Sequence, residues 1–199
     1  MSRVRRSRLL RHIPNLITVL RGAGGVVGAW LLLQSAGAAL EETAVFYAAL
    51  SGLIFIVAAL TDWLDGWLAR RLGAQSALGA LLDPIADKVL TGAYLVAYTF
   101  IAGGNPALAV PVAIILLRDI VVTGLRLAVP PRADGAYAVT NDAKAKTALT
   151  MIIVALPFVL VAAGLTDVTR WFYIWVGGVW LCAALTIWSG LPYLRSAFR

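Results

Sequence analysis

The stretch Thr61–Asp87 reads TDWLDGWLARRLGAQSALGALLDPIAD and places four carboxylates among mostly apolar side chains. Asp62 and Asp65 are three residues apart, and Asp83 and Asp87 are four apart. Each pair therefore lies on one face of its own helix. Carboxylates in apolar surroundings are unstable unless cations balance them. The stretch predicts a divalent-metal site that is built from two helices inside a membrane.

The composition of the whole chain agrees with insertion into a bilayer. Hydrophobic residues make up 61% of the 199 residues and charged residues 14%, against about 25% charged in soluble domains. Uncharged runs of the ~20 residues that a spanning helix needs recur along the chain. We predict an all-α integral membrane protein, one domain over 1–199, with six transmembrane helices near 15–35, 43–71, 78–102, 106–128, 141–165 and 170–195.

Basic residues predict the orientation of these helices. Residues 2–12 read SRVRRSRLLRH, typical of an amphipathic juxtamembrane helix on an anionic leaflet or of a disordered basic anchor. Lys and Arg also gather in the second-to-third and fourth-to-fifth connections and at the C-terminus. The positive-inside rule then places both termini and the carboxylate cluster on the cytoplasmic side. Because Asn15, Thr18 and Arg21 interrupt the first apolar run, we expect no cleaved secretory leader.

Other residue types restrict the chemistry. The single Cys182 cannot form an internal disulfide and is expected to be a packed core thiol. The single histidine, His12, lies in the basic N-terminal segment, so no histidine is available for a zinc site deep in the fold. The glycines of the first helix indicate close helix packing: Gly22, Gly24, Gly25 and Gly28.

The four carboxylates lie on two stripes that a short connection can bring face to face. Gly66 and Arg70 continue the first stripe, and Gly79 begins the second. A ligand set made only of oxygen suits Mg²⁺ or Mn²⁺, and four carboxylates can hold two ions. Arg70 adds a fork for a phosphate group. These residues alone leave three possibilities open: phosphoryl-transfer catalysis, a structural ion network, and cation transport.

The spacing D-x2-D-G-x2-A-R-x8-G-x3-D-x3-D resembles the signature of the CDP-alcohol phosphotransferase family at every fixed position. The resemblance implies that an alcohol attacks a CDP-linked lipid and that CMP leaves. It implies metal ligation by Asp62, Asp65 and Asp83, and a second-metal and general-base role for Asp87. The residues implied to contact the CDP-lipid are Asn15, Thr18, Asp62, Gly66, Arg70, Ser76 and Gly79. For Asn15, helix capping or packing is an alternative.

Four further stretches are similar to the phosphatidylglycerophosphate synthase branch of that family: IPNLITVLR, LLDPIADKVL, LLRDIVVTGLR and AKAKTALTM. The branch implies CDP-diacylglycerol as donor and sn-glycerol 3-phosphate as acceptor. A dianionic acceptor needs cationic partners, and the same cytoplasmic side offers Arg118, Arg126, Lys144 and Lys146.

Helix geometry sorts these four cations. Arg118 and Arg126 are about 80° apart around a helix and ~12 Å apart along it, so both can line one cavity. Lys144 and Lys146 are about 200° apart, so we expect only one to face the site, and we favour Lys144. The alternative for all four is that they are positive-inside residues that reach the membrane surface.

Two departures from the branch keep other acceptors open. Phosphatidylglycerophosphate synthases often have Glu where this chain has Asp119 after Arg118, and a second Glu where it has Leu127. Cardiolipin synthases, which use phosphatidylglycerol, have Arg-Asp at the first place. Inositol-phosphate transfer is a third option. The resemblance also implies a homodimer. Because the sequence has no signal for another compartment, we expect a bacterial inner membrane, with membrane lipids and no nucleic acid as partners.

Overall fold

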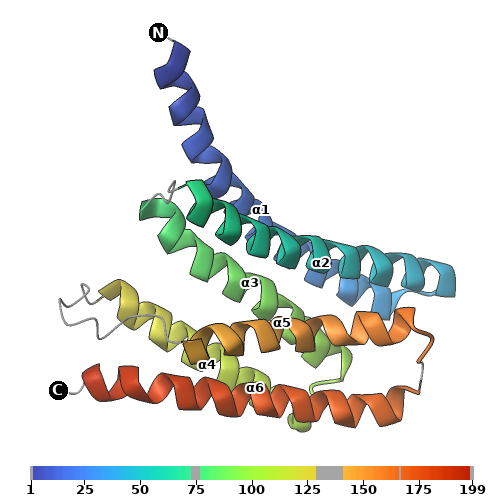
Figure 1. Cartoon of the computed structure of the whole chain (residues 1–199). Coiled ribbons are helices and arrows are strands. Elements are labelled where there is room, and N and C mark those ends of the chain that lie inside the picture. The colour runs from blue at the N-terminus through green and yellow to red at the C-terminus, as the bar shows by residue number, and fades with distance from the viewer. Residues whose placement is uncertain (1, 73–76, 129–140, 166, 198–199) are drawn as a thin grey trace. The chain divides into compact units, whose positions relative to one another are not determined.

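The computed structural model describes the backbone of residues 2–72, 77–128, 141–165 and 167–197, and within them the side chains of 15–62, 82–124, 146–165, 167 and 170–190. All regular secondary structure in these ranges is α-helical (Figure 1). The helices in chain order are α1 (Ser2–Gly37), α2 (Glu41–Leu72), α3 (Ala77–Ile101), α4 (Pro106–Ala128), α5 (Asn141–Ala162) and α6 (Val168–Ala197).

These helices confirm the predicted all-α class, and their bounds differ from the predicted ones by a few residues at most ends. The main difference is at the N-terminus, where the basic segment and the first apolar run form one continuous helix from Ser2. This agrees with the interpretation of the segment as a helix, and not with a disordered anchor. The side chains before Asn15 lie outside the description.

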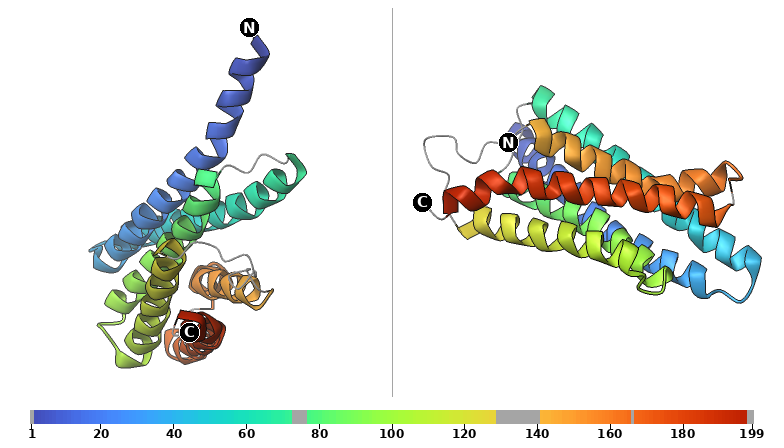
Figure 2. Two further views of the ribbon diagram at one scale, coloured as in Figure 1. Left: turned by 90° about the vertical axis from the view of Figure 1, so that its left-hand side faces the viewer. Right: turned by 90° about the horizontal axis from the view of Figure 1, so that it is seen from below.

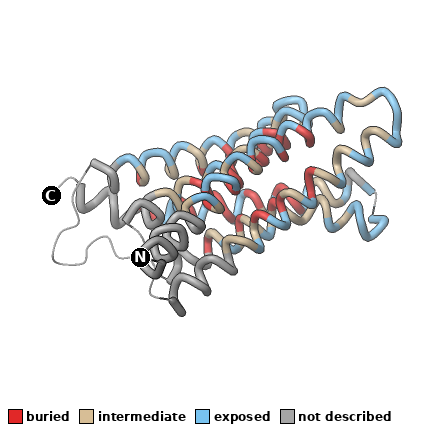
Figure 3. Tube along the Cα trace, turned by 90° about the horizontal axis from the view of Figure 1, so that it is seen from above, coloured by how far each residue is buried: buried red, intermediate tan, exposed pale blue. Residues whose placement is uncertain are grey.

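Four helices contain a stretch that is long and apolar enough to cross a membrane: Asn15–Gly37, Glu41–Asp62, Pro106–Gly124 and Arg170–Gly190. The described apolar part of α5, Lys146–Ala162, is shorter. In α3, Asp83, Asp87 and Lys88 lower the hydropathy of the first half of the helix. Many large apolar side chains are exposed among the described residues, and Figure 3 shows exposed positions along the helices. Such exposure is typical of surfaces that face lipid.

The chain divides by its contacts into two units, Met1–Ala97 and Tyr98–Arg199. In the first unit, α1 and α2 lie side by side (Figure 1), and one buried network joins them to α3. The Tyr94 hydroxyl donates to the carbonyl of Ser51 at 2.7 Å, and the Ser51 hydroxyl donates to the carbonyl of Gly28 at 2.8 Å. The ring of Phe55 packs edge-on against Tyr94 with centroids 4.9 Å apart.

The glycines of α1 allow a close approach, as the sequence predicted. A Cβ atom on Gly25 would lie 2.6 Å from the Cα of Leu90 in α3, too close for any side chain. A Cβ on Gly22 would meet Ala86 at 3.7 Å. Arg21 precedes Gly25 by four residues and therefore lies on the same face of α1. The glycine contact brings Arg21 toward the first half of α3.

The second unit holds α4, α5 and α6, and both views of Figure 2 show α6 beside α4 and α5. Indole groups on α6 link the three helices. Trp175 donates to the carbonyl of Ile153 in α5 at 2.7 Å, and Trp180 donates to the carbonyl of Ala107 in α4 at 2.9 Å. Cys182 is buried, which confirms the expectation of a core thiol.

A short turn separates α3 from α4 where the sequence reads GGNP. Gly103 and Gly104 adopt positive φ values of 65° and 72°, which glycine reaches without strain. The Asn105 side chain accepts the backbone N–H of Ala107 at 2.9 Å and so caps α4. Pro106 occupies the first helical position, where its missing N–H has no partner to lose. Local sequence therefore fixes the end of one helix and the start of the next.

Candidate functional site

Three carboxylates of the predicted metal site surround one arginine of α1. Arg21 is buried, with 3% of its surface exposed. Its Nη1 forms an ion pair with Asp62 of α2 and lies 3.5 Å from Oδ1 of Asp87 of α3. Its Nη2 lies 3.3 Å from Oδ1 of Asp83 of α3. One carboxylate of α2 and two carboxylates of α3 thus meet at the same guanidinium group.

The three carboxylates differ in their access to solvent. The Asp83 side chain is 51% exposed and accepts a hydrogen bond of 2.5 Å from the Thr18 hydroxyl. The Asp87 side chain is 20% exposed, and its Oδ1 is buried without a hydrogen bond. The buried Oδ1 of Asp87 lies within ion-pair distance of Arg21 but accepts no hydrogen bond, so a further cation would lower the cost of burying it.

The donor chemistry of this cluster fits a hard divalent cation. Asp62, Asp83 and Asp87 offer only carboxylate oxygens, the ligands that Mg²⁺ and Mn²⁺ prefer, and the buried Oδ1 of Asp87 has no hydrogen-bond donor. Among the described residues, no three His, Cys, Asp or Glu side chains lie close enough to hold an ion by themselves. Asp65, the fourth predicted ligand, has a side chain outside the description.

Several other predicted residues also fall outside the described side chains. Among the residues predicted to contact the CDP-lipid these are Gly66, Arg70, Ser76 and Gly79. Among the cations predicted to bind the acceptor they are Arg126 and Lys144. Of the CDP-lipid residues on α1, Thr18 is buried and touches the cluster, and Asn15 is half-buried.

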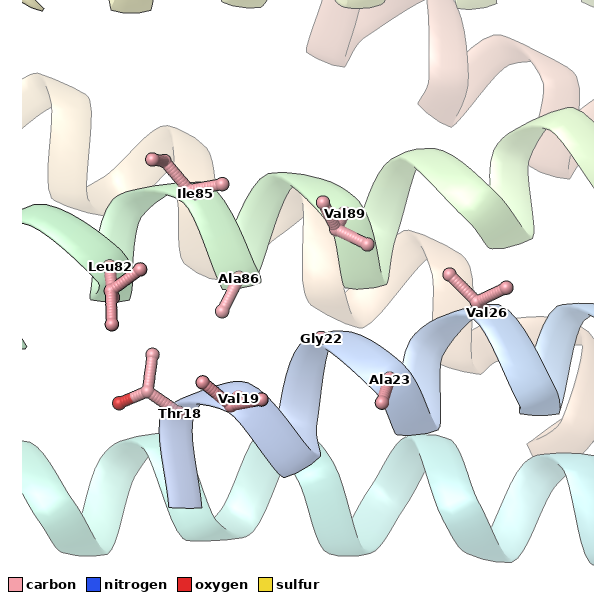
Figure 4. Close-up of a pocket in the computed structure, with 9 residues that line it drawn as sticks. All are labelled: Thr18, Val19, Gly22, Ala23, Val26, Leu82, Ile85, Ala86 and Val89. Carbon is pink, nitrogen blue, oxygen red and sulfur yellow. The ribbon is translucent and has the colours of Figure 1, made fainter. Parts of the chain in front are cut away.

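An apolar groove of about 260 Å³ runs between α1 and the first half of α3. Figure 4 shows Thr18, Gly22, Ala23 and Val26 following one another along α1, opposite side chains of α3 that include Ala86. Because Thr18 also bonds to Asp83, the groove begins beside the carboxylate cluster. The groove therefore offers an apolar surface directly next to a charged site.

The second unit contains a cluster of opposite charge. Asp119 of α4 accepts hydrogen bonds of 2.9 Å from Nη1 of Arg118 and from Nζ of Lys146 of α5. Nη2 of Arg118 donates to the Ser189 hydroxyl of α6 at 2.9 Å. Lys146 is 7% exposed. Two of the four predicted acceptor-binding cations thus meet at one carboxylate, and Lys146 is the lysine whose buried position is shown.

A glycine of α6 makes room for the arginine of this cluster. A Cβ on Gly190 would lie 3.0 Å from Nε of Arg118, which is tighter than nearly all real contacts. Nε of Arg118 is buried and has no hydrogen bond. The close packing of α4 against α6 therefore fixes where the guanidinium group lies.

Sequence reasoning missed the central member of each cluster. It named Arg21 only as an interruption of the first apolar run, and it treated Asp119 only as a departure from a branch pattern. The signal was present in both cases, because an ion in a long apolar run must have a counter-ion nearby. What the sequence does not give is the identity of that counter-ion.

Comparison with known proteins shows the family of this chain. The family model for CDP-alcohol phosphatidyltransferase matches residues 11–188. A protein of Cereibacter sphaeroides is 35% identical over 93% of this chain and 95% of its own length, and one of Pseudomonas fluorescens is 38% identical over 94% and 90%. A protein of Arabidopsis thaliana is 35% identical over 73% of this chain and 66% of its own length.

The proteins of both bacteria are named CDP-diacylglycerol–glycerol-3-phosphate 3-phosphatidyltransferase, and the plant protein bears the same name with the number 2. The matched range includes Arg21 and its carboxylates as well as Asp119 and its two cations. This chain therefore belongs to the CDP-alcohol phosphatidyltransferase family.

Proposed function

We propose that this chain transfers the phosphatidyl group of CDP-diacylglycerol to sn-glycerol 3-phosphate and releases CMP, as the names of its relatives describe for them. The observation that carries the proposal is similarity to those relatives over almost the whole chain. The two clusters supply matching chemistry, since one is rich in carboxylates for a cation and the other is rich in cations for an anionic acceptor.

The carboxylate cluster is the proposed reaction centre. Asp62, Asp65, Asp83 and Asp87 would hold two divalent ions, Mg²⁺ or Mn²⁺, and the family generally uses divalent metals. Such ions would stabilise charge on the diphosphate. Asp87 acts as the general base: it takes the proton from the acceptor hydroxyl as the new O–P bond forms and the bond to CMP breaks. Its 20% exposed side chain supports this role.

The CDP-lipid is proposed to lie along α1, α2 and the start of α3. The residues assigned to it are Asn15, Thr18, Asp62, Gly66, Arg70, Ser76 and Gly79. The groove that starts at Thr18 is assigned to an acyl chain, because it is apolar and adjoins the cluster. An acyl chain in this position would leave the diphosphate end of the lipid near the carboxylates.

The basic cluster is proposed to bind the acceptor phosphate through Arg118, Arg126, Lys144 and Lys146. The described pair supports this assignment, since Arg118 and Lys146 converge on one carboxylate and together outweigh its charge. Arg118 can present a planar fork to phosphate oxygens, and Lys146 adds a point charge.

The proposed setting is a bacterial inner membrane. All six helices would cross it, with both termini and the reaction centre on the cytoplasmic side and the helical segment before Asn15 on the leaflet surface. The four long apolar helices support the assignment to a membrane. The proposed assembly is a homodimer.

An acceptor panel tests the function. The purified protein in detergent receives CDP-diacylglycerol and Mg²⁺ with glycerol 3-phosphate, phosphatidylglycerol, inositol phosphate or serine, and CMP release is measured. We expect glycerol 3-phosphate to give the fastest release. Preference for phosphatidylglycerol would instead assign cardiolipin synthesis, the candidate that Asp119 after Arg118 favours. No CMP with any acceptor, together with Mn²⁺ flux into proteoliposomes, would assign cation transport.

A further inference from the structure

Arg21 contacts every described carboxylate of the metal cluster with the terminal nitrogens of its guanidinium group. Nη1 pairs with Asp62 and reaches Asp87, and Nη2 reaches Asp83. The side chain is 1% exposed, and its Nε has no hydrogen bond. The guanidinium group is therefore held in place by carboxylates from two other helices.

The carboxylates that Arg21 contacts are the same carboxylates that the proposed divalent ions would use. In each of the three pairs the acceptor is the Oδ1 atom. An oxygen that faces a guanidinium group cannot give its full negative charge to a metal ion at the same time. Two cations that draw on the same oxygens also repel one another in a site of low dielectric. Arg21 and a divalent ion must therefore compete for these carboxylates.

We propose that Arg21 is a resident counter-ion that stabilises the α1–α2–α3 unit before metal binds and competes with the divalent ions for the same carboxylates. This inference rests on the metal site of the proposed function. Arg21 is then a positioning residue: it stabilises the protein when no metal is bound, and it lowers the affinity of the site for metal. Without a cation at this place, carboxylates at the interface of three helices would repel each other and lack compensation.

A permanent structural ion pair is the alternative, and it makes a different prediction. If Arg21 only joins α1 to α2 and α3, its removal destabilises the protein equally with and without divalent ions. If Arg21 balances the carboxylates only while the ions are absent, a divalent ion can replace it. The stability that is lost on removal of Arg21 then depends on whether the ion is bound. Metal dependence of stability therefore separates the two roles without a measurement of turnover.

The test compares wild type with Arg21→Gln in detergent, by thermal unfolding followed through tryptophan fluorescence. In EDTA we expect the variant to melt at least about 5 °C lower, since a buried charge network has lost its cation. Saturating Mn²⁺ should restore most of this loss. Paramagnetic resonance of Mn²⁺ should show tighter binding to the variant, by at least about tenfold. Arg118→Gln is the matched control: it also removes a partly buried arginine, and Mn²⁺ should not rescue it.

Two further variants keep the test decisive if Arg21→Gln folds poorly. Arg21→Lys retains one charge but cannot reach three carboxylates at once, and should fall between wild type and Arg21→Gln in EDTA. Arg21→Gln with Asp62→Asn removes both members of one pair and should recover yield and melting temperature in EDTA. A purely structural pair would recover in the same way, so the double variant secures folding and the response of these variants to Mn²⁺ separates the two roles.

The outcomes separate this inference from the metal assignment. If Mn²⁺ stabilises wild type and Arg21→Gln by the same amount and binds both equally, only the counter-ion role is wrong. If Mn²⁺ neither binds nor stabilises either protein, the metal site and the counter-ion role both fall. Greater stabilisation and tighter binding in Arg21→Gln support both.

Discussion

The two charged clusters of this chain are built in opposite ways. In the first unit one arginine, Arg21, lies among three described carboxylates, so that negative charge is in excess. In the second unit one carboxylate, Asp119, lies between two described cations, so that positive charge is in excess. Among the described side chains, each cluster thus holds ions of both signs, with one sign in excess.

This contrast shows how an apolar chain can hold a charged site without its ligand. Complete neutralisation would leave nothing for a ligand to bind, and no neutralisation would leave buried charges that repel each other. Partial neutralisation gives a fold that is stable and still attracts ions. The excess charge of each cluster agrees in sign with its proposed ligand, divalent cations for the first and the phosphate of the acceptor for the second.

The largest effect is expected from Asp87→Asn in the first cluster. The change keeps the size of the side chain and removes both its charge and its ability to take a proton. We expect CMP release to fall by about a thousandfold, since general-base catalysis alone contributes about 10²–10⁴. The measurement is turnover of CDP-diacylglycerol with glycerol 3-phosphate at saturating Mg²⁺. Turnover within tenfold of wild type would exclude Asp87 as the base.

Asp119→Asn tests the second cluster in the same manner. Two partly buried cations lose their shared counter-ion, so the free energy of unfolding should fall by about 3 kcal/mol. The melting temperature should fall on the order of 6–12 °C. Inorganic phosphate should restore more stability to the variant than it adds to wild type.

Ser189→Ala is the control for Asp119→Asn, because it removes a neutral partner of the same Arg118. Loss of that bond should lower stability by about 1 kcal/mol, with no special response to phosphate. An Asp119→Asn protein that behaves like Ser189→Ala would show that Asp119 does not act as a counter-ion.

The sequence predicted much of the first cluster and less of the second. Long apolar runs located the helices, and fixed spacing placed Asp62 on one helix and Asp83 and Asp87 on the next. In both clusters the counter-ion pairing depends on which helix faces which, and that depends on packing. The glycine contact of Gly25 on Leu90 brings α1 against α3, and no periodicity shows that partner.

The position of the α5 lysines illustrates the same limit. An ideal helix separates Lys144 and Lys146 by about 200°, so one was expected to face inward. The geometry of a single helix cannot choose between them. The choice comes from the rotation of α5 relative to Asp119 of α4, which buries Lys146. The inward orientation preferred for Lys144 stays a prediction, since its side chain lies outside the description.

Arg118→Lys should have a smaller effect, and it tests whether the two substrates bind at different clusters. Lysine keeps the charge but cannot bond to Asp119 and Ser189 together while it presents a fork to phosphate. We expect the KM for glycerol 3-phosphate to rise about tenfold, as the loss of one charged hydrogen bond implies. The KM for CDP-diacylglycerol should stay within about twofold. An equal rise for both substrates would contradict the division of ligands between the clusters.

The smallest effect concerns the groove that adjoins the first cluster. Ala23 lines the groove and is exposed, so Ala23→Trp fills part of it without disturbing a buried contact. If an acyl chain lies there, the KM for long-chain CDP-diacylglycerol should rise about fourfold, which corresponds to the lost contact of about one methylene group. A short-chain CDP-lipid should bind as before. Val27→Trp is the matched control, since Val27 is 50% exposed on the same helix but does not line the groove. Equal effects of Ala23→Trp and Val27→Trp would exclude the groove as the acyl-chain site and leave the lipid positioned by the charged cluster alone.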